Sequence, residues 1–244
     1  MKIQYLKHYS SYLGRDMEFK IYGHSGKPVL FIPCQSGRFF DFENFHMVDH
    51  WAQWIEEGRC TVYSVDTVDD MAWAAVGADN RWRIENHERW FNYIVNELIP
   101  TIHFLSGRHD ILPFGCSMGA MHAANLFFRR PDLFDGLFAI SGVYDSLDFF
   151  DHYMDDLVYN NSPMHYLSGM HQDHHYIDMY NQRKILICVG QGAWEEQLVA
   201  STRRLEGVLH QKGIHARFEY WGHDVDHDWP WWYKMCHVYV PEFL

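Results

Sequence analysis

Short apolar runs alternate along the chain with segments whose apolar residues recur at helical spacing. Most of the runs are bounded by glycine or proline, and seven are predicted to be strands: residues 17–23, 29–33, 60–66, 111–115, 137–142, 185–190 and 216–222. The middle five are apolar almost throughout, which is typical of parallel strands buried on both faces of a sheet. The first run follows a turn-like segment, residues 13–16, and is predicted to be an antiparallel edge strand.

Apolar residues at helical spacing predict four helices between these strands, at residues 45–55, 84–102, 120–128 and 198–209. Pro100 is expected to kink or end the second helix, because proline lacks the amide hydrogen that a helix needs. Gly213 is expected to stop the last one. This alternation of strands and helices predicts βαβ units in one doubly wound α/β sheet.

Residues 143–183 interrupt the alternation. They are rich in aromatic residues and methionine without a clear period, and about 40 residues are too many for a plain connection. Because the segment follows a strand at the ligand-binding edge of such a sheet, we expect a cap over a pocket. The alternative is a surface insertion with a small core of its own.

Composition narrows the class of partner. The formal net charge of −12 repels phosphate backbones, so no nucleic-acid partner is expected. No apolar run has the length of a membrane span, and the N-terminal residues lack the apolar stretch of a secretory signal. Five cysteines, an odd number without close pairing, indicate reduced thiols. We therefore expect a cytoplasmic protein of one domain, residues 1–244, with no membrane partner; the oligomeric state stays open.

Residues 115–119 read Gly-Cys-Ser-Met-Gly and fit the G-x-S-x-G motif between a predicted strand and a predicted helix. In that context a sharp turn exposes the serine hydroxyl at the top of the sheet, which makes Ser117 the candidate nucleophile. The alternative is a tight turn that serves packing alone. The amide of Met118 would then point at a developing oxyanion. Cys116 is expected to face the sheet as a small buried side chain.

A serine nucleophile needs a base and an acid that orients the base, in the chain order Ser, acid, His for this kind of sheet. His223 and His227 both follow the last predicted strand, and position alone does not separate them. Glu195 and Glu196 follow the strand at residues 185–190 and are the acid candidates. The alternative for both glutamates is that they only complement the dipole of the next helix.

With these residues the chain resembles the esterase family of α/β-hydrolases that includes S-formylglutathione hydrolase, feruloyl and acetyl-xylan esterase domains and the antigen 85 mycolyltransferases. The resemblance runs over residues 11–232. It rests on an opening strand signature at 11–17, the elbow at 115–119, Arg-Pro-Asp-Leu-Phe at 130–134 and Ala-Ile-Ser-Gly at 139–142. It implies an α/β-hydrolase fold with an antiparallel N-terminal edge and a cap-like insertion, residues 143–183, after the sixth strand.

Two further motifs carry the resemblance to the catalytic groups. Glu-Glu-Gln-Leu at residues 195–198 is similar to the family's E-D-x-L and implies Glu196 as the acid. His-Asp-Trp-Pro-Trp-Trp at residues 227–232 fits its H-x-W-x-x-W and implies His227 as the base. The acid is Glu where the family usually has Asp, which is tolerable because the carboxylate only has to hold the imidazole tautomer.

The loop after the strand at residues 29–33 departs from the family. It reads Pro-Cys-Gln-Ser-Gly instead of the common His-Gly, so the second oxyanion donor is assigned to the amide of Gln35, with Cys34 as the alternative. Trp194 and Trp229 each lie within two residues of a candidate catalytic group and are predicted to wall the substrate pocket.

Histidine clusters at residues 46–50 and 171–175 have ligand-like spacing but fit no recognised metal motif, so neither a metal nor another cofactor is expected. The sequence thus predicts a serine carboxylester hydrolase that forms an acyl-enzyme from a small or medium ester, with acyl- or feruloyl-sugars as one substrate class. The alternatives are an acyltransferase with the same triad and a catalytically silent binding protein on the same fold.

Overall fold

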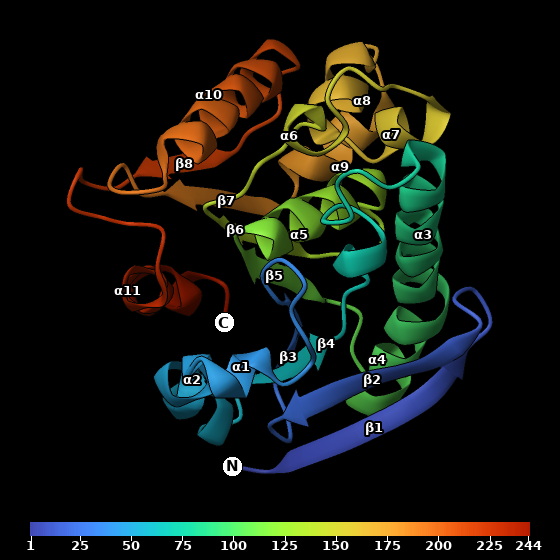
Figure 1. Ribbon diagram of the computed structural model, residues 1–244. Coiled ribbons are helices and arrows are strands. Elements are labelled where there is room, and N and C mark those ends of the chain that lie inside the picture. The colour runs from blue at the N-terminus through green and yellow to red at the C-terminus, as the bar shows by residue number, and fades with distance from the viewer.

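The computed structural model describes residues 1–244 and is built on one eight-stranded sheet (Figure 1). Its strands lie in the order β1-β2-β4-β3-β5-β6-β7-β8. Their bounds are Ile3–Ser10 (β1), Arg15–Tyr22 (β2), Lys27–Ile32 (β3), Cys60–Val65 (β4), Leu112–Cys116 (β5), Gly136–Ile140 (β6), Lys184–Val189 (β7) and Arg217–Tyr220 (β8). All neighbours from β4 to β8 pair in parallel, so the predicted doubly wound, mostly parallel α/β sheet is confirmed.

Helices pack on both faces of this sheet (Figure 1). They are α1 (Asp41–Asn44), α2 (Met47–Glu56), α3 (Asn80–Tyr93), α4 (Ile99–Ser106), α5 (Met118–Arg129), α6 (Leu147–Phe150), α7 (Asp156–Asn160), α8 (Pro163–Gly169), α9 (His175–Asn181), α10 (Glu196–Gln211) and α11 (Trp229–Tyr239). Apolar residues of α3, α4, α5 and α10 form the core on one face, and those of α2 and α11 form the core on the other.

The central strand β3 shows why the middle strands are apolar throughout. Leu30 and Ile32 belong to the core under α5, whereas Val29 and Phe31 belong to the core under α2 and α11. Successive side chains of a strand point to opposite faces of the sheet, so a strand covered on both sides has no polar face.

The structure corrects the prediction at the N-terminal edge. β1, which was not predicted, pairs antiparallel with β2 over residues 3–10 and takes the edge position. β2 was predicted to be the edge but lies between β1 and β4, antiparallel to both. Only Ser10 of β1 is fully buried, so apolar and polar residues mix along this strand and no apolar run marks it.

Pro100 was predicted to kink or end the second helical segment, and the helix does not end there. A π-helical turn, Ile94–Leu98, joins α3 to α4, and α4 continues to Ser106. Pro100 stands in the first turn of α4, where its missing amide hydrogen is not needed. The wider π turn therefore shifts the hydrogen-bond register just ahead of the proline.

Residues 143–183 fold into α6, α7, α8 and α9, four short helices that gather beside α3 and α10 (Figure 1). Buried residues from this segment, among them Tyr144, Phe150, Leu167 and Tyr180, join the same core as α5. Residues 143–183, here called the excursion, are thus packed onto the main core through several aromatic side chains. Its first part, around α6, borders the pocket described below.

Candidate active site

Ser117 occupies a sharp turn between β5 and α5, with φ +57° and ψ −126°. The two glycines of the motif are required by close backbone contacts. A Cβ on Gly115 would lie 2.3 Å from the carbonyl carbon of Gly119, and a Cβ on Gly119 would lie 2.2 Å from the Ile32 oxygen. The turn predicted at residues 115–119 is therefore present, and it lifts the Ser117 side chain above the end of the sheet.

His227 lies opposite this serine. Its Nε2 is 3.0 Å from the Ser117 Oγ, and its backbone amide donates to the Ala193 carbonyl at 3.0 Å, which fixes the loop that carries the ring. His223 does not approach the serine: it is exposed, and its Nδ1 lies 3.4 Å from the Gln191 carbonyl oxygen. Of the two histidines that position left open, the geometry brings His227 to the nucleophile.

The carboxylate beside His227 belongs to Glu195, not to the predicted Glu196. Glu195 Oε1 lies 3.4 Å from His227 Nδ1, an ion-pair distance without the alignment of a hydrogen bond. Glu195 is fully buried, whereas Glu196 is exposed at the first position of α10. Adjacent residues at a helix start point about 100° apart, so only one of the two can face the imidazole.

A buried hydroxyl supports this carboxylate. Ser141, the residue after β6, donates its hydroxyl to Glu195 Oε1 at 2.6 Å. The sequence prediction missed this contact, although Ser141 belongs to the Ala-Ile-Ser-Gly motif at residues 139–142. The hydroxyl partly compensates the cost of burying the Glu195 charge.

Two backbone amides, those of Met118 and Gln35, are candidates for an oxyanion site. Met118 and Gln35 both line the cavity that holds Ser117 and His227, and neither amide donates a hydrogen bond within the chain. Cys34, the alternative to Gln35, does not line this cavity. The Met118 amide also lies at the N-terminus of α5, where the helix dipole favours negative charge.

The cavity at Ser117 has a volume of about 310 Å³. Ten residues line it, five of them apolar and five polar: Met118, Met121, Val143, Phe149 and Leu198, and Gln35, Ser117, Asp148, Gln197 and His227. Val143, Asp148 and Phe149 come from the excursion, so that segment supplies one wall of the cavity.

The two predicted tryptophan walls are not among these lining residues. Trp194 is 81% exposed, and Trp229 stacks on Phe45 with the ring centroids 4.6 Å apart. The tryptophan that contacts the base is Trp232, which is buried and packs edge-on against the His227 ring at 4.9 Å. Trp232 is the last residue of the H-x-W-x-x-W motif, so the sequence did hold a signal for it.

Cys116 is not a competing nucleophile. It lies fully buried in the core under α2 and α11, and this burial raises the pKa of its thiol well above the usual range. Only a thiolate attacks a carbonyl readily, so a thiol held neutral in the core is inert.

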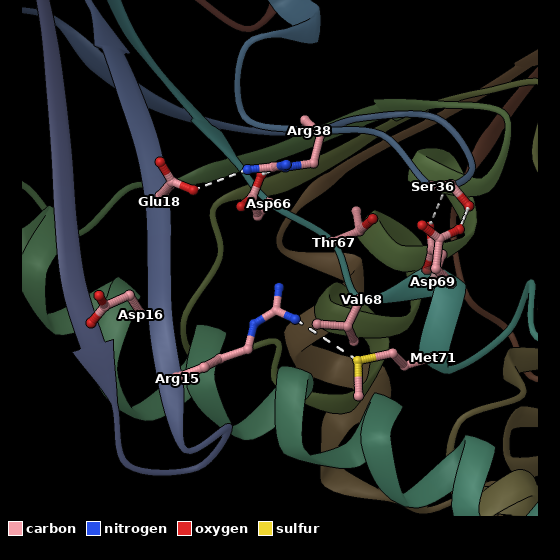
Figure 2. A pocket seen from close by; sticks show the side chains of 11 residues that line it. Arg15, Asp16, Glu18, Ser36, Arg38, Asp66, Thr67, Val68, Asp69 and Met71 are labelled. Carbon is pink, nitrogen blue, oxygen red and sulfur yellow. Dashed lines mark hydrogen bonds and ion pairs between the residues drawn. The ribbon is translucent and has the colours of Figure 1, made fainter.

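A second cavity, of about 410 Å³, is lined in part by Ser36 and Arg38, which follow Gln35 in the chain (Figure 2). Figure 2 shows Arg38 reaching to Glu18 and Asp66, while Arg15 extends toward Met71, whose sulfur lies 3.8 Å away. Ser36, at the rim, is bonded to Asp69 through its amide. Fixed polar contacts therefore hold the loop that carries these residues.

Left-handed backbone marks this edge of the sheet. Six residues other than glycine have a positive φ, and four of them follow the ends of parallel strands: Ser36 after β3, Ser117 after β5, Ser141 after β6 and Trp194 after β7. Their φ angles lie between +52° and +67°. Ser117 is the candidate nucleophile, and Ser141 donates its hydroxyl to Glu195. Ser36 directly follows Gln35, and Trp194 directly precedes Glu195.

No group of three or more His, Cys, Asp or Glu side chains is placed to hold a metal ion. No helix has both the length and the apolar character needed to cross a membrane. The arrangement at Ser117 can perform nucleophilic chemistry with protein groups alone.

Comparison with known proteins adds a family and a fold. The family model described as "Putative esterase" matches residues 10–237. No curated protein sequence matches the chain.

Among solved structures, a ferulic acid esterase superposes with a TM-score of 0.75 at 14% identity, covering 99% of this chain and 97% of that one. An S-formylglutathione hydrolase from Agrobacterium tumefaciens gives 0.75 at 14% identity, with 99% and 94% covered. The fluorophosphonate-binding serine hydrolase F of Staphylococcus aureus gives 0.71 at 16% identity, with 99% and 98% covered. At such identities the likeness is one of fold, and it confirms the predicted α/β-hydrolase fold.

Proposed function

The chain belongs to this esterase family, and from that membership we propose that it is a serine carboxylester hydrolase in which Ser117, His227 and Glu195 form the catalytic triad. The observation that carries the proposal is the 3.0 Å contact between His227 Nε2 and Ser117 Oγ at the strand-to-helix turn. A hydroxyl becomes a competent nucleophile when a neutral imidazole can take its proton.

The acylation half-reaction follows from this geometry. The Ser117 Oγ attacks the ester carbonyl carbon while its proton passes to His227 Nε2, and the carbonyl oxygen becomes an oxyanion. The free amides of Met118 and Gln35 donate to that oxyanion, each contributing about 3 kcal/mol to transition-state stabilisation. His227 then gives its proton to the leaving alcohol as the carbon–oxygen bond breaks, which leaves an acyl group on Ser117.

Water completes the cycle. His227 Nε2 takes a proton from the attacking water, a second tetrahedral intermediate forms on the same oxyanion donors, and Ser117 leaves with the proton returned by His227. Glu195 holds the imidazole in its productive tautomer and stabilises the imidazolium that forms twice per turnover. No cofactor is required for either half-reaction.

A small or medium ester fits the proposed site. The cavity of about 310 Å³ has an apolar side formed by Met118, Met121 and Phe149, which suits an acyl chain or an aromatic acyl group. Gln197 and Asp148, which are hydrogen-bonded to each other, place polar groups on the same wall and suit hydroxyls of the alcohol part. Acyl- or feruloyl-sugars are therefore one proposed substrate class, with the excursion around α6 acting as the edge of a cap.

A panel of p-nitrophenyl esters from acetate to octanoate, together with acetylated and feruloylated sugars, tests this function. We expect turnover of the shorter esters and covalent labelling of Ser117 by a fluorophosphonate. Adding an alcohol or sugar acceptor separates hydrolysis from the acyltransferase alternative, because a transferase would pass the acyl group to the acceptor in preference to water. A protein that turns over no ester and takes no label would contradict the proposal.

The acid is tested by two matched variants at neighbouring positions. Glu195→Gln is expected to lower kcat by about 10²–10⁴-fold, because a neutral amide can neither fix the imidazole tautomer nor stabilise the imidazolium. Glu196→Gln, on the exposed side of the helix start, is expected to change kcat by less than about tenfold. Both are measured on the best aryl ester, with thermal unfolding as the check on folding. The opposite ranking would return the acid to Glu196.

A further inference from the structure

A second carboxylate–imidazole pair lies buried behind the loop that carries Gln35. Asp69, at the start of the 3₁₀ turn Asp69–Met71, and His122, on α5, are only 2% and 1% exposed. His122 Nε2 and Asp69 Oδ1 are 2.8 Å apart. This pair has no part in the triad, so its burial calls for another explanation.

The same carboxylate holds the oxyanion loop. Asp69 Oδ2 accepts a hydrogen bond from the Ser36 amide at 3.1 Å, a contact that Figure 2 shows at the rim of the second cavity. Ser36 directly follows Gln35 and has a φ of +56°. Fixing the peptide plane after Gln35 restricts rotation of the Gln35 backbone, because only two soft dihedrals separate neighbouring planes.

His122 is itself held in place. Its ring stacks on His87 with centroids 5.2 Å apart and contacts Trp90 at 5.1 Å. Burial lowers the pKa of His87 well below its usual range, so that neighbour is a neutral packing surface. His122 also lies on the helix that begins directly after Ser117. Asp69 thus ties the nucleophile's helix to the loop of the second oxyanion donor.

A buried carboxylate is costly unless it accepts hydrogen bonds, and the His122 ring and the Ser36 amide are the donors that reach the Asp69 side chain. If Asp69 served packing alone, an apolar residue at its position would give the fold equal or greater stability. With these two contacts, Asp69 can hold the loop at a fixed distance from α5.

We propose that Asp69 and His122 are positioning residues that set the second donor of the oxyanion hole by clamping the Gln35–Ser36 turn to α5. The inference rests on the proposed esterase function and names residues that act on it from outside the cavity at Ser117. Neither residue touches the reacting atoms. Their contribution is to the alignment of the Gln35 amide when the carbonyl oxygen becomes an oxyanion.

The test compares Asp69→Ala, His122→Ala and His122→Gln. Loss of a whole oxyanion donor costs about 10²–10³-fold in kcat, so a misaligned donor is expected to cost about 10–100-fold in the two alanine variants. KM should change by less than about twofold, because the donor acts mainly in the transition state. The inhibition constant of a trifluoromethyl ketone, which forms a tetrahedral oxyanion on the serine, should rise by the same factor as kcat falls. His122→Gln, with an amide N–H near the position of Nε2, should recover most of the loss.

Ser201→Ala is the matched control, since Ser201 is another fully buried polar residue, on α10, and accepts a hydrogen bond from the Tyr144 amide rather than from the loop or from the residues around His122. It should lower the unfolding temperature while leaving kcat per titrated active site and the ketone inhibition constant unchanged. A variant that merely unfolds in part also leaves that constant unchanged, because the constant reports the folded molecules only.

An unchanged ketone inhibition constant in folded Asp69→Ala would overturn the inference. The proposed function would still stand if the wild-type protein turns over esters. If Asp69→Ala does not fold, the two His122 variants provide the test. The inference is then overturned if His122→Ala, His122→Gln and the wild type have equal ketone inhibition constants. Wild-type protein that neither turns over esters nor takes the fluorophosphonate would instead remove the proposed function itself.

Discussion

Alanine in place of Ser117 is expected to lower kcat for a simple aryl ester by about 10⁶-fold, the cost of losing the nucleophile of a triad. No other group can replace the hydroxyl, because the neighbouring Cys116 is fully buried and its thiol pKa is raised by that burial. Alanine keeps the Cβ and therefore the same backbone strain at φ +57°, so the fold should persist. The measurement is steady-state turnover of p-nitrophenyl acetate.

Cys116→Ala is the control for this variant, since it alters the adjacent residue of the same turn. It should retain most of the wild-type kcat, and circular dichroism of both variants should match the wild type. More than about one per cent of activity left in Ser117→Ala would show that another residue forms the acyl-enzyme.

His227→Ala is expected to be nearly as damaging, at about 10⁶-fold in kcat, because triad members act as a unit. Without the imidazole, nothing within reach of Ser117 takes the proton during attack or returns it to the leaving alcohol. The variant should still bind substrate, so the loss is sought by single-turnover release of p-nitrophenol.

His223→Ala provides the matched control, four residues away on the same loop and exposed. Its kcat should stay within about tenfold of the wild type. If His223→Ala lost activity and His227→Ala kept it, the base would have been assigned to the wrong histidine.

Most of the sheet and the turn at Ser117 could be predicted from local sequence patterns. Apolar runs between glycines located seven of the eight strands to within a few residues, because strands buried on both faces leave no polar positions. The turn at Ser117 was predictable for a different reason. At both glycines of the motif, a Cβ atom would collide with neighbouring backbone. The turn therefore requires glycine at these positions, and the sequence motif reveals the turn directly.

The remaining features depended on information that no local pattern holds. Which of Glu195 and Glu196 faces the imidazole is set by the backbone at the start of α10, where Trp194 has a positive φ that a bulky residue rarely adopts. β1 is an edge strand with one fully buried residue, so its register comes from pairing with β2 and not from an apolar run. Asp69 and His122 are 53 positions apart, and only the tertiary structure joins them.

The left-handed residues after β3, β5, β6 and β7 have a consequence for how such a protein would respond to selection. A residue other than glycine in a sparsely populated backbone region costs of order 1–3 kcal/mol, so this edge opposes the stability that the two cores supply. Glycine at Trp194, whose side chain is 81% exposed, would relieve that strain, whereas glycine at Ser36 would relieve it but lose the Ser36 hydroxyl contact to Asp70. Either glycine would also free the backbone beside Gln35 or Glu195. Selection for thermal stability alone would therefore favour substitutions at these turns, and those substitutions would lower kcat.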